Sequence, residues 1–175
     1  EKVKPVLFIN KVDRLINELQ VTPEDMMERF KETITKVNRL IRQFAPEEKK
    51  KEWQVSVGDG TVAFGSAYHN WGITVPYMAK SGISFKDIFE FCNNEQQKEL
   101  ARKAPVHEVL LDMAVTKLPG PVEAQPYRIP NIWNGDLETE IGQAMIKCDP
   151  EAELAMMITK IWMDPHAGEV AVGRL

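Results

Sequence analysis

The amino-acid sequence predicts an α/β domain, a sheet with helices, followed by the first strands of an all-β unit. Three observations lead to this fold class. The chain opens on a β-branched and aromatic run, residues 3–9, that leads directly into a short helical stretch. A long helix with one apolar face follows between residues 22 and 44. The chain closes on two strand-type runs, residues 154–163 and 169–175, around a turn.

The first part of the sequence predicts one strand and two helices. The opening strand ends at Asn10, and the first helical stretch runs to Leu19. Thr22, Pro23 and Asp25 then occupy the cap, the first position and the third position of a helix start. Apolar residues recur along this helix at three- and four-residue steps: Met26, Met27, Phe30, Ile34, Val37, Leu40, Ile41 and Phe44. We interpret this stripe as core-facing, with a partner-binding helix as the alternative.

The middle of the sequence predicts a hairpin and a series of helices. Residues 53–57 and 61–65 are strand-type runs joined by the turn Gly58-Asp59-Gly60. Short helices are predicted at residues 73–80, 85–91 and 95–103, and a longer helix begins at Pro105. Pro119-Gly120-Pro121 ends that helix and is the predicted domain boundary.

The predicted organisation is a domain over residues 1–121, an extended connector over residues 122–150 and the start of a β unit over residues 151–175. Two prolines and an Asn-Gly-Asp turn favour the extended connector. A lone hairpin is marginally stable in water, so its partner strands must lie outside this sequence or it must pack on the first domain. Because the chain begins and ends within strand-type runs, we expect it to be a piece of a longer protein.

Composition and charge exclude several classes of protein. Hydrophobic side chains make up 43% and charged side chains 27% of the 175 residues, as in a globular protein. No apolar run approaches the ~20 residues that cross a bilayer, and no secretory signal opens the chain. The formal net charge of -4 gives no field that would draw the whole chain to nucleic acid. Cys92 and Cys148 lack CxxC spacing and indicate reduced cytosolic thiols.

The three histidines have no recognisable chemistry in the sequence. His107 and His166 lack the spacing of metal ligands. His69 has no carboxylate or cysteine partner that the sequence identifies, so we interpret it as a surface or loop residue rather than a catalytic base. The sequence therefore predicts no catalytic residue and no metal ligand in this chain.

Two polar motifs at the ends of strand-type runs predict a binding site. Asn10-Lys11-Val12-Asp13 follows the first strand, and Gly65-Ser66-Ala67 ends another. Ligands bind outside the carboxyl ends of the strands in parallel α/β sheets, so the two motifs can converge on one site. The residue types suit guanine, because the Asp13 carboxylate can accept from both the ring N–H and the exocyclic amine of that base. Adenine does not display these two donors together.

The other residues of the motifs complete the predicted guanine site. The stem of Lys11 can lie against the flat face of the base, and Asn10 can tie the two loops together. A backbone N–H near Ala67 can donate to the guanine carbonyl. A bidentate match is worth about 1–3 kcal/mol of discrimination, which is enough to prefer GTP and GDP over ATP. The predicted guanine-nucleotide-binding residues are Asn10, Lys11, Asp13, Ser66 and Ala67, and an unliganded polar corner is the alternative.

The phosphate-binding half of a nucleotide site is missing from the sequence. Residues 60–65 have the glycine spacing of a phosphate loop, but Ser66 and Ala67 stand where the loop needs a lysine and a serine or threonine. No GxxxxGK[ST] and no Asp-x-Pro-Gly motif occurs elsewhere in the chain. We therefore predict that this chain alone does not hydrolyse GTP.

These motifs resemble those of translational GTPases. Residues 6–15 are similar to the fourth guanine-nucleotide motif, and residues 62–67, with Asn70-Trp71-Gly72, look like the fifth motif of the archaeal and eukaryotic elongation factor 2 family. The resemblance continues through residues 110–113, 118–119, 122–125, 127–130 and 164–170, and so covers nearly the whole chain.

The resemblance implies a fold and a function. In that family this stretch is the second half of a P-loop GTPase-type domain, the G domain, with a helical insertion, followed by the first strands of a β-barrel second domain. The implied parent is a GTP hydrolase that drives ribosomal translocation, with GTP or GDP and Mg²⁺ as ligands and the ribosome as partner. The ligands of the magnesium ion are not expected in this chain. A cytoplasmic monomer without membrane contact is expected.

Two alternatives to this function stay open in the sequence. One is a non-catalytic module whose long helix, residues 22–44, binds a protein or the ribosome. The other is a related translational GTPase of the release or recycling type.

Overall fold

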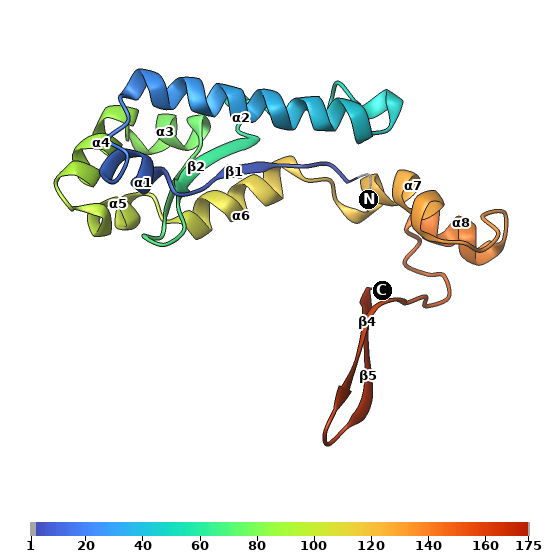
Figure 1. Ribbon diagram of the computed structural model, residues 1–175. Helices are drawn as coiled ribbons and strands as arrows, with labels where there is room; N and C mark the ends of the chain where they lie inside the picture. Colours follow the sequence, from blue (N-terminus) through green and yellow to red (C-terminus); the bar gives the residue numbers. More distant parts are fainter. Residues whose placement is uncertain (1–2, 175) are drawn as a thin grey trace. The chain divides into compact units, whose positions relative to one another are not determined.

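The structure is a computed structural model that describes residues 3–174 (Figure 1). It contains both α-helices and small β-sheets, as the sequence predicts. The chain divides into two compact units, with the division between Leu118 and Pro119. In the described part of the chain, no helix combines the length and the apolar character needed to cross a lipid bilayer.

A small mixed sheet forms the centre of the first unit. Its described strands are β1 (Leu7–Ile9), β2 (Val62–Ser66) and β3 (Trp71–Ile73), in the order β1-β2-β3. β1 runs parallel to β2, with Ile9 opposite Phe64, and β2 pairs antiparallel with β3. Because β1 and β2 point the same way, the residues that follow these two strands lie at the same edge of the sheet.

Helices cover both faces of this sheet, with α2 on one side and α6 on the other (Figure 1). Side chains alternate between the faces of a strand, so the neighbours Ala63 and Phe64 point in opposite directions. The Phe64 ring contacts Phe30 of α2 at a centroid distance of 4.6 Å. Ala63 packs with Val109 and Met113 of α6. The helical elements of this unit are α1 (Val12–Asn17), α2 (Pro23–Phe44), the 3-10 turn η1 (Glu47–Lys49), α3 (Val75–Ser81), α4 (Phe85–Asn93), α5 (Gln97–Lys103) and α6 (Val106–Lys117).

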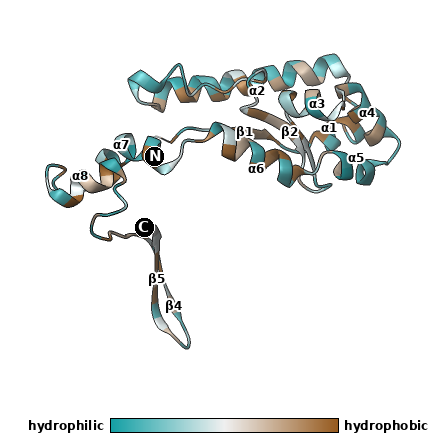
Figure 2. Ribbon diagram, turned by 180° about the vertical axis from the view of Figure 1, so that it is seen from behind, coloured by the Kyte–Doolittle hydropathy of each residue, from teal (hydrophilic) through white to brown (hydrophobic). Residues whose placement is uncertain are grey.

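The long predicted helix is confirmed, but its apolar stripe is only partly core-facing. Thr22 caps α2, because its Oγ1 accepts from the Asp25 N–H at 3.2 Å. Of the apolar stripe, Met26, Phe30 and Ile41 are buried, while Met27, Leu40 and Phe44 are exposed. Figure 2 shows hydrophilic residues along much of the helix. At 100° per residue the three buried residues form one narrow line, and Met27 and Leu40 flank it. Phe44 continues the line but is the last residue of the helix.

The predicted strand over residues 53–57 is absent, and this prediction was wrong. Trp53 and Val55 are buried, and the polar Gln54 lies between them, which is the alternation typical of a strand. The backbone of Val55, however, is paired by a side chain: its N–H donates to Asn38 Oδ1 at 2.8 Å, and its carbonyl accepts from Asn38 Nδ2 at 2.9 Å. The Thr61 hydroxyl pairs in the same way with both backbone groups of Ser56. These side chains replace the ladder that a strand would need.

The antiparallel partner of β2 is instead β3, which the sequence analysis did not identify. This strand is only three residues long and contains Gly72, so its pattern carries little strand signal. Trp71 in β3 is fully buried, and its Nε1 donates to the Gln97 side chain at 3.0 Å. The predicted helices that follow are confirmed within a few residues as α3 to α6.

Replacement of Asn38 by alanine is expected to destabilise the first unit by about 2 kcal/mol. The change leaves the N–H and the carbonyl of a buried residue, Val55, without their partner. Urea unfolding of the variant measures the loss. Thr35→Ala, which removes an exposed polar side chain from the same helix, is the matched control and should change stability by less than ~0.5 kcal/mol. Equal effects of the two changes would contradict this account of residues 53–57.

The second unit consists of two helices and a hairpin. These are α7 (Pro121–Ile132), α8 (Glu140–Lys147), β4 (Met157–Asp164) and β5 (Gly168–Arg174). The predicted hairpin is confirmed within the described residues, with Asp164 opposite Gly168 at the turn. The Asp164 carboxylate accepts from the backbone N–H groups of Ala167 and His166, each at 2.8 Å. These two hydrogen bonds hold the pKa of Asp164 below its ordinary value.

The extended connector predicted over residues 122–150 was wrong, because α7 and α8 occupy most of it. Pro126 and Pro130 lie inside α7, although a proline removes one helical hydrogen bond. Both prolines are exposed, so water can satisfy the carbonyls that lose an N–H partner. Ala124 and Ile129 are buried, and α7 packs against α8. Tertiary packing therefore outweighs the local preference of the prolines.

Candidate functional site

The side chain of Asn10 joins the two predicted motifs. Asn10 follows β1 directly, and its Oδ1 accepts from the backbone N–H of Lys11 at 2.8 Å. The same oxygen accepts from the backbone N–H of Ala67 at 3.0 Å, although the two residues are 57 positions apart. The structure therefore brings the loop after β1 and the loop after β2 together at one edge of the sheet.

Lys11 lies at the start of α1 in a left-handed conformation. Its φ of 66° is uncommon for a residue other than glycine, asparagine or aspartate and carries a small energetic cost. The hydrogen bond from its N–H to Asn10 helps to hold this conformation. The side chain is exposed and forms no ion pair with any residue between 3 and 174. Its stem is thus available to a ligand at this edge.

Asp13 lies in the first turn of α1 and is only 8% exposed. Val12 and Ile16 on the same helix are also buried, so the helix faces the core on this side. A carboxylate in the first turn is stabilised by the positive end of the helix dipole. Its Oδ2 lies 3.7 Å from Nε2 of His69.

Ser66 and Ala67 hold the loop between β2 and β3. Ser66 is buried, and its Oγ accepts from the His69 N–H at 3.2 Å. This makes Ser66 a residue that fixes the loop. The N–H of Ala67 is engaged by Asn10, so a base carbonyl would have to share it or use the next N–H, that of Tyr68. In the described residues the Tyr68 N–H has no acceptor.

His69 is the residue of this region that the sequence analysis missed. We interpreted it as lacking a carboxylate partner, and the structure corrects this, because Asp13 is that partner. The two residues come from α1 and from the loop after β2. No spacing rule links such distant positions, so only the folded chain could reveal the contact.

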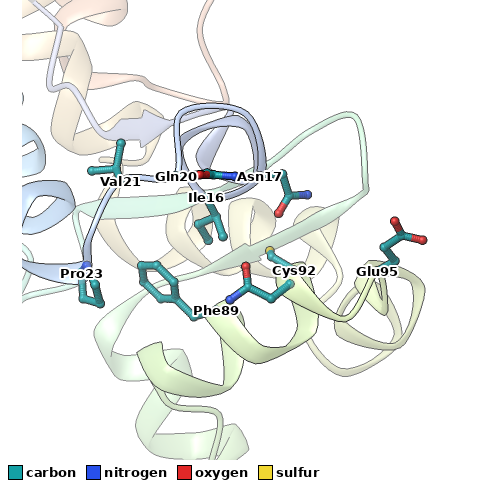
Figure 3. A pocket seen from close by; sticks show the side chains of 9 residues that line it. Ile16, Asn17, Gln20, Val21, Pro23, Phe89, Cys92 and Glu95 are labelled. Carbon is teal, nitrogen blue, oxygen red and sulfur yellow. The ribbon is translucent and has the colours of Figure 1, made fainter.

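A cavity of about 530 Å³ lies beside α1, outside the predicted guanine site (Figure 3). It is lined by Ile16, Asn17, Gln20, Val21, Pro23, Phe89, Cys92, Asn93 and Glu95. None of the five predicted site residues lines it. Cys92 lines this cavity and is also close enough to Asp13 to feel its charge. Burial, together with the negative charge of Asp13, raises the pKa of the Cys92 thiol to about 12.

Cys92 is expected to resist thiol reagents in the folded protein. Its raised pKa leaves almost no thiolate at pH 8, whereas Cys148 is only half-buried. Labelling with a chromogenic disulfide reagent should therefore modify Cys148 at least ~10-fold faster, with Cys92 reacting only on unfolding. Because the folded pKa lies above the unfolded one, this thiol should also reduce stability as the pH rises above about 8.5. Equal labelling rates at the two cysteines would contradict the burial of Cys92.

Among residues 3–174, no group of three or more histidine, cysteine, aspartate or glutamate side chains could hold a metal ion. At the sheet edge the Asp13 carboxylate offers two acceptor oxygens, and the side chain of Lys11 is exposed.

Comparison with known proteins gives two findings. Residues 1–120 match the family model of the elongation factor Tu GTP binding domain. The whole chain is similar to proteins named elongation factor 2: it is 64% identical to the one from Methanococcus aeolicus, 62% to that from Methanocaldococcus jannaschii and 61% to that from Methanopyrus kandleri. All 175 residues are covered, but they span 24%, 24% and 14% of these relatives. The chain thus spans about a quarter or less of their length.

Proposed function

The chain belongs to the family of the elongation factor Tu GTP-binding domain, and we propose that its first unit recognises the guanine base of GTP and GDP. One observation carries this proposal: Asn10 Oδ1 binds both the Lys11 N–H and the Ala67 N–H, so the two motifs form one site. The buried Asp13 carboxylate at the same site is a suitable acceptor for the two donors of guanine.

Each residue has a distinct role in the proposed site. Asp13 accepts from the ring N–H and the exocyclic amine, and the stem of Lys11 covers one face of the base. Asn10 and Ser66 act on the loops, through the hydrogen bonds to Ala67 and His69. The base carbonyl accepts from the backbone at Ala67 or Tyr68. No residue of the chain is assigned a catalytic role.

The whole protein that carries this chain is proposed to be a translation elongation factor that hydrolyses GTP during ribosomal translocation. The names of the relatives, at 61–64% identity over all 175 residues, support this. In this proposal the β4–β5 hairpin begins a β-barrel second domain, and Mg²⁺ accompanies GTP without a ligand assigned in the described residues. The cytoplasm as location and a monomeric state complete the proposal. A partner-binding module and a release- or recycling-type GTPase are not favoured by these relatives.

A direct titration tests the proposed base recognition. Ligand-observed NMR with the 175-residue chain compares guanosine and GDP with adenosine and ADP, at concentrations up to the millimolar range. The guanine compounds should bind at least ~5-fold more tightly, as a bidentate base contact of about 1 kcal/mol requires. Equal signals from guanosine and adenosine would contradict the proposal.

The chain by itself is expected to release no phosphate from GTP. Ser66 and Ala67 stand where a phosphate loop needs a lysine and a serine or threonine, so no lysine there neutralises the phosphates. A phosphate-release assay with the purified chain measures this. Turnover that scales with protein concentration and is lost in Asp13→Ala would overturn the prediction.

A further inference from the structure

The carboxylate that is proposed to recognise guanine already faces a side chain of the protein. Oδ2 of Asp13 lies 3.7 Å from Nε2 of His69. This distance is too long for a hydrogen bond, but it is within ion-pair range when the imidazole is protonated. The Asp13 side chain is 11% exposed and that of His69 is 34% exposed. The imidazole therefore covers part of the small surface by which Asp13 is reached.

The loop that carries His69 is anchored by its backbone rather than by the imidazole. The His69 N–H donates to Ser66 Oγ, and the Ala67 N–H donates to Asn10 Oδ1. The Asn70 N–H donates to the Ala67 carbonyl at 3.3 Å, and Asn70 has a left-handed φ of 58°. The imidazole itself lies roughly perpendicular to the exposed Tyr68 ring, at a centroid distance of 4.9 Å. It can rotate away from Asp13 while the loop stays in place.

We propose that His69 gates the guanine site, by occupying the Asp13 carboxylate when no base is bound and by turning aside when guanine binds. This inference rests on the proposed function. Guanine must present its donors to the same carboxylate oxygens, so the base and the imidazole compete for them. His69 is therefore a specificity-determining residue. A ligand without donors for Asp13 forms no hydrogen bonds that replace the contact between Asp13 and the imidazole.

The competition depends on pH, because a protonated imidazole holds a carboxylate more strongly than a neutral one does. Other charged or ionisable groups also lie around Asp13. Lys11 and Arg14 flank it on its own segment, and Arg14 is paired to Glu18 at 3.5 Å. Cys92 on α4 stays neutral, since burial and Asp13 raise its pKa to about 12. The phenol of Tyr68 lies next to His69 on the loop after β2.

The expected change in guanosine affinity follows from the fraction of molecules in which the imidazole leaves the Asp13 carboxylate free. Histidine is the side chain that ordinarily changes charge between pH 5 and 8. If the protonated form excludes the base, the Kd for guanosine rises severalfold as the pH falls from 8 to 6. Guanosine is the probe because it lacks the phosphate groups of GDP, which themselves titrate near pH 6.

Ligand-observed NMR with the 175-residue chain at pH 6 and pH 8 tests the gate in three proteins. The unmodified chain should bind guanosine severalfold more weakly at pH 6 than at pH 8. His69→Ala should bind it more tightly than the unmodified chain at pH 6 and equally at both pH values. His107→Ala, which removes an exposed histidine from α6, is the matched control and should behave as the unmodified chain does.

Two other results would overturn the gate, and they differ in meaning. If guanosine binds better than adenosine but His69→Ala keeps the affinity and the pH dependence of the unmodified chain, the gate is wrong and base recognition stands. If neither the unmodified chain nor His69→Ala prefers guanosine over adenosine, base recognition fails and the gate fails with it.

Discussion

Asp13→Asn is expected to abolish the preference for guanine. The change replaces one acceptor oxygen of a nearly isosteric side chain by an NH₂ group, which faces a donor of the base. Loss of the bidentate match and a new donor–donor contact together should weaken guanosine binding by about 30-fold, or ~2 kcal/mol. Xanthosine, whose base has a carbonyl in place of the exocyclic amine, should gain affinity, because the new NH₂ group can donate to it.

Titration of Asp13→Asn with guanosine, adenosine and xanthosine measures this exchange. Asp25→Asn is the matched control, because Asp25 also lies in the first turn of a helix but is exposed on α2. It should leave all three affinities unchanged. Retention of guanosine preference in Asp13→Asn, with unchanged unfolding in urea, would assign base recognition to other residues.

Gly65→Ala is expected to destabilise the first unit by about 3 kcal/mol or more, through overpacking in the centre of the sheet. A Cβ on Gly65 would overlap the carbonyl oxygen of Trp71 and approach the Cα of Gly72 to 2.8 Å. Both are backbone atoms of β3, so no side-chain rotation relieves the clash. The same Cβ would lie 3.1 Å from the ring of Phe8 in β1.

The same substitution should also disturb the candidate site, since Ser66 and Ala67 follow Gly65 directly. Urea unfolding measures the loss of stability, and guanosine titration measures the effect on the site. Gly58→Ala is the matched control: its Cβ would meet only Ser56 Oγ, at 3.8 Å, so it should change stability by less than ~0.5 kcal/mol. A Gly65→Ala protein as stable as the Gly58→Ala protein would show that β2 and β3 are not packed as described.

Local signals predicted most of the elements of the first unit. Thr22 and Pro23 placed the start of α2 within one residue, because a cap and a first-turn proline act on adjacent backbone groups. Pro105 did the same for α6, where it is the cap residue. The strand-type run at residues 61–65, which the structure shows as β2 (Val62–Ser66), and the motif after β1 were likewise identified from neighbouring residues.

Two predictions failed because a tertiary contact outweighed a local preference. Residues 53–57 have the pattern of a strand, but the Asn38 side chain pairs the backbone of Val55. The prolines of α7 predict extended chain, but burial of Ala124 and Ile129 stabilises a helix. The local preference was outweighed by side-chain hydrogen bonds in the first case and by packing in the second.

The sequence by itself determined the two motifs from which guanine recognition is predicted, since Asn10, Lys11 and Asp13 lie within four residues and follow a strand. It also identified Ser66 and Ala67 at the end of a second strand. Only the tertiary structure decided that Asn10 joins the two loops and that His69 faces Asp13. The physical reason is that both contacts depend on the parallel pairing of β1 with β2 and on the hairpin of β2 with β3. Pairing over such separations is set by burial of the whole sheet, which no local pattern of residues encodes.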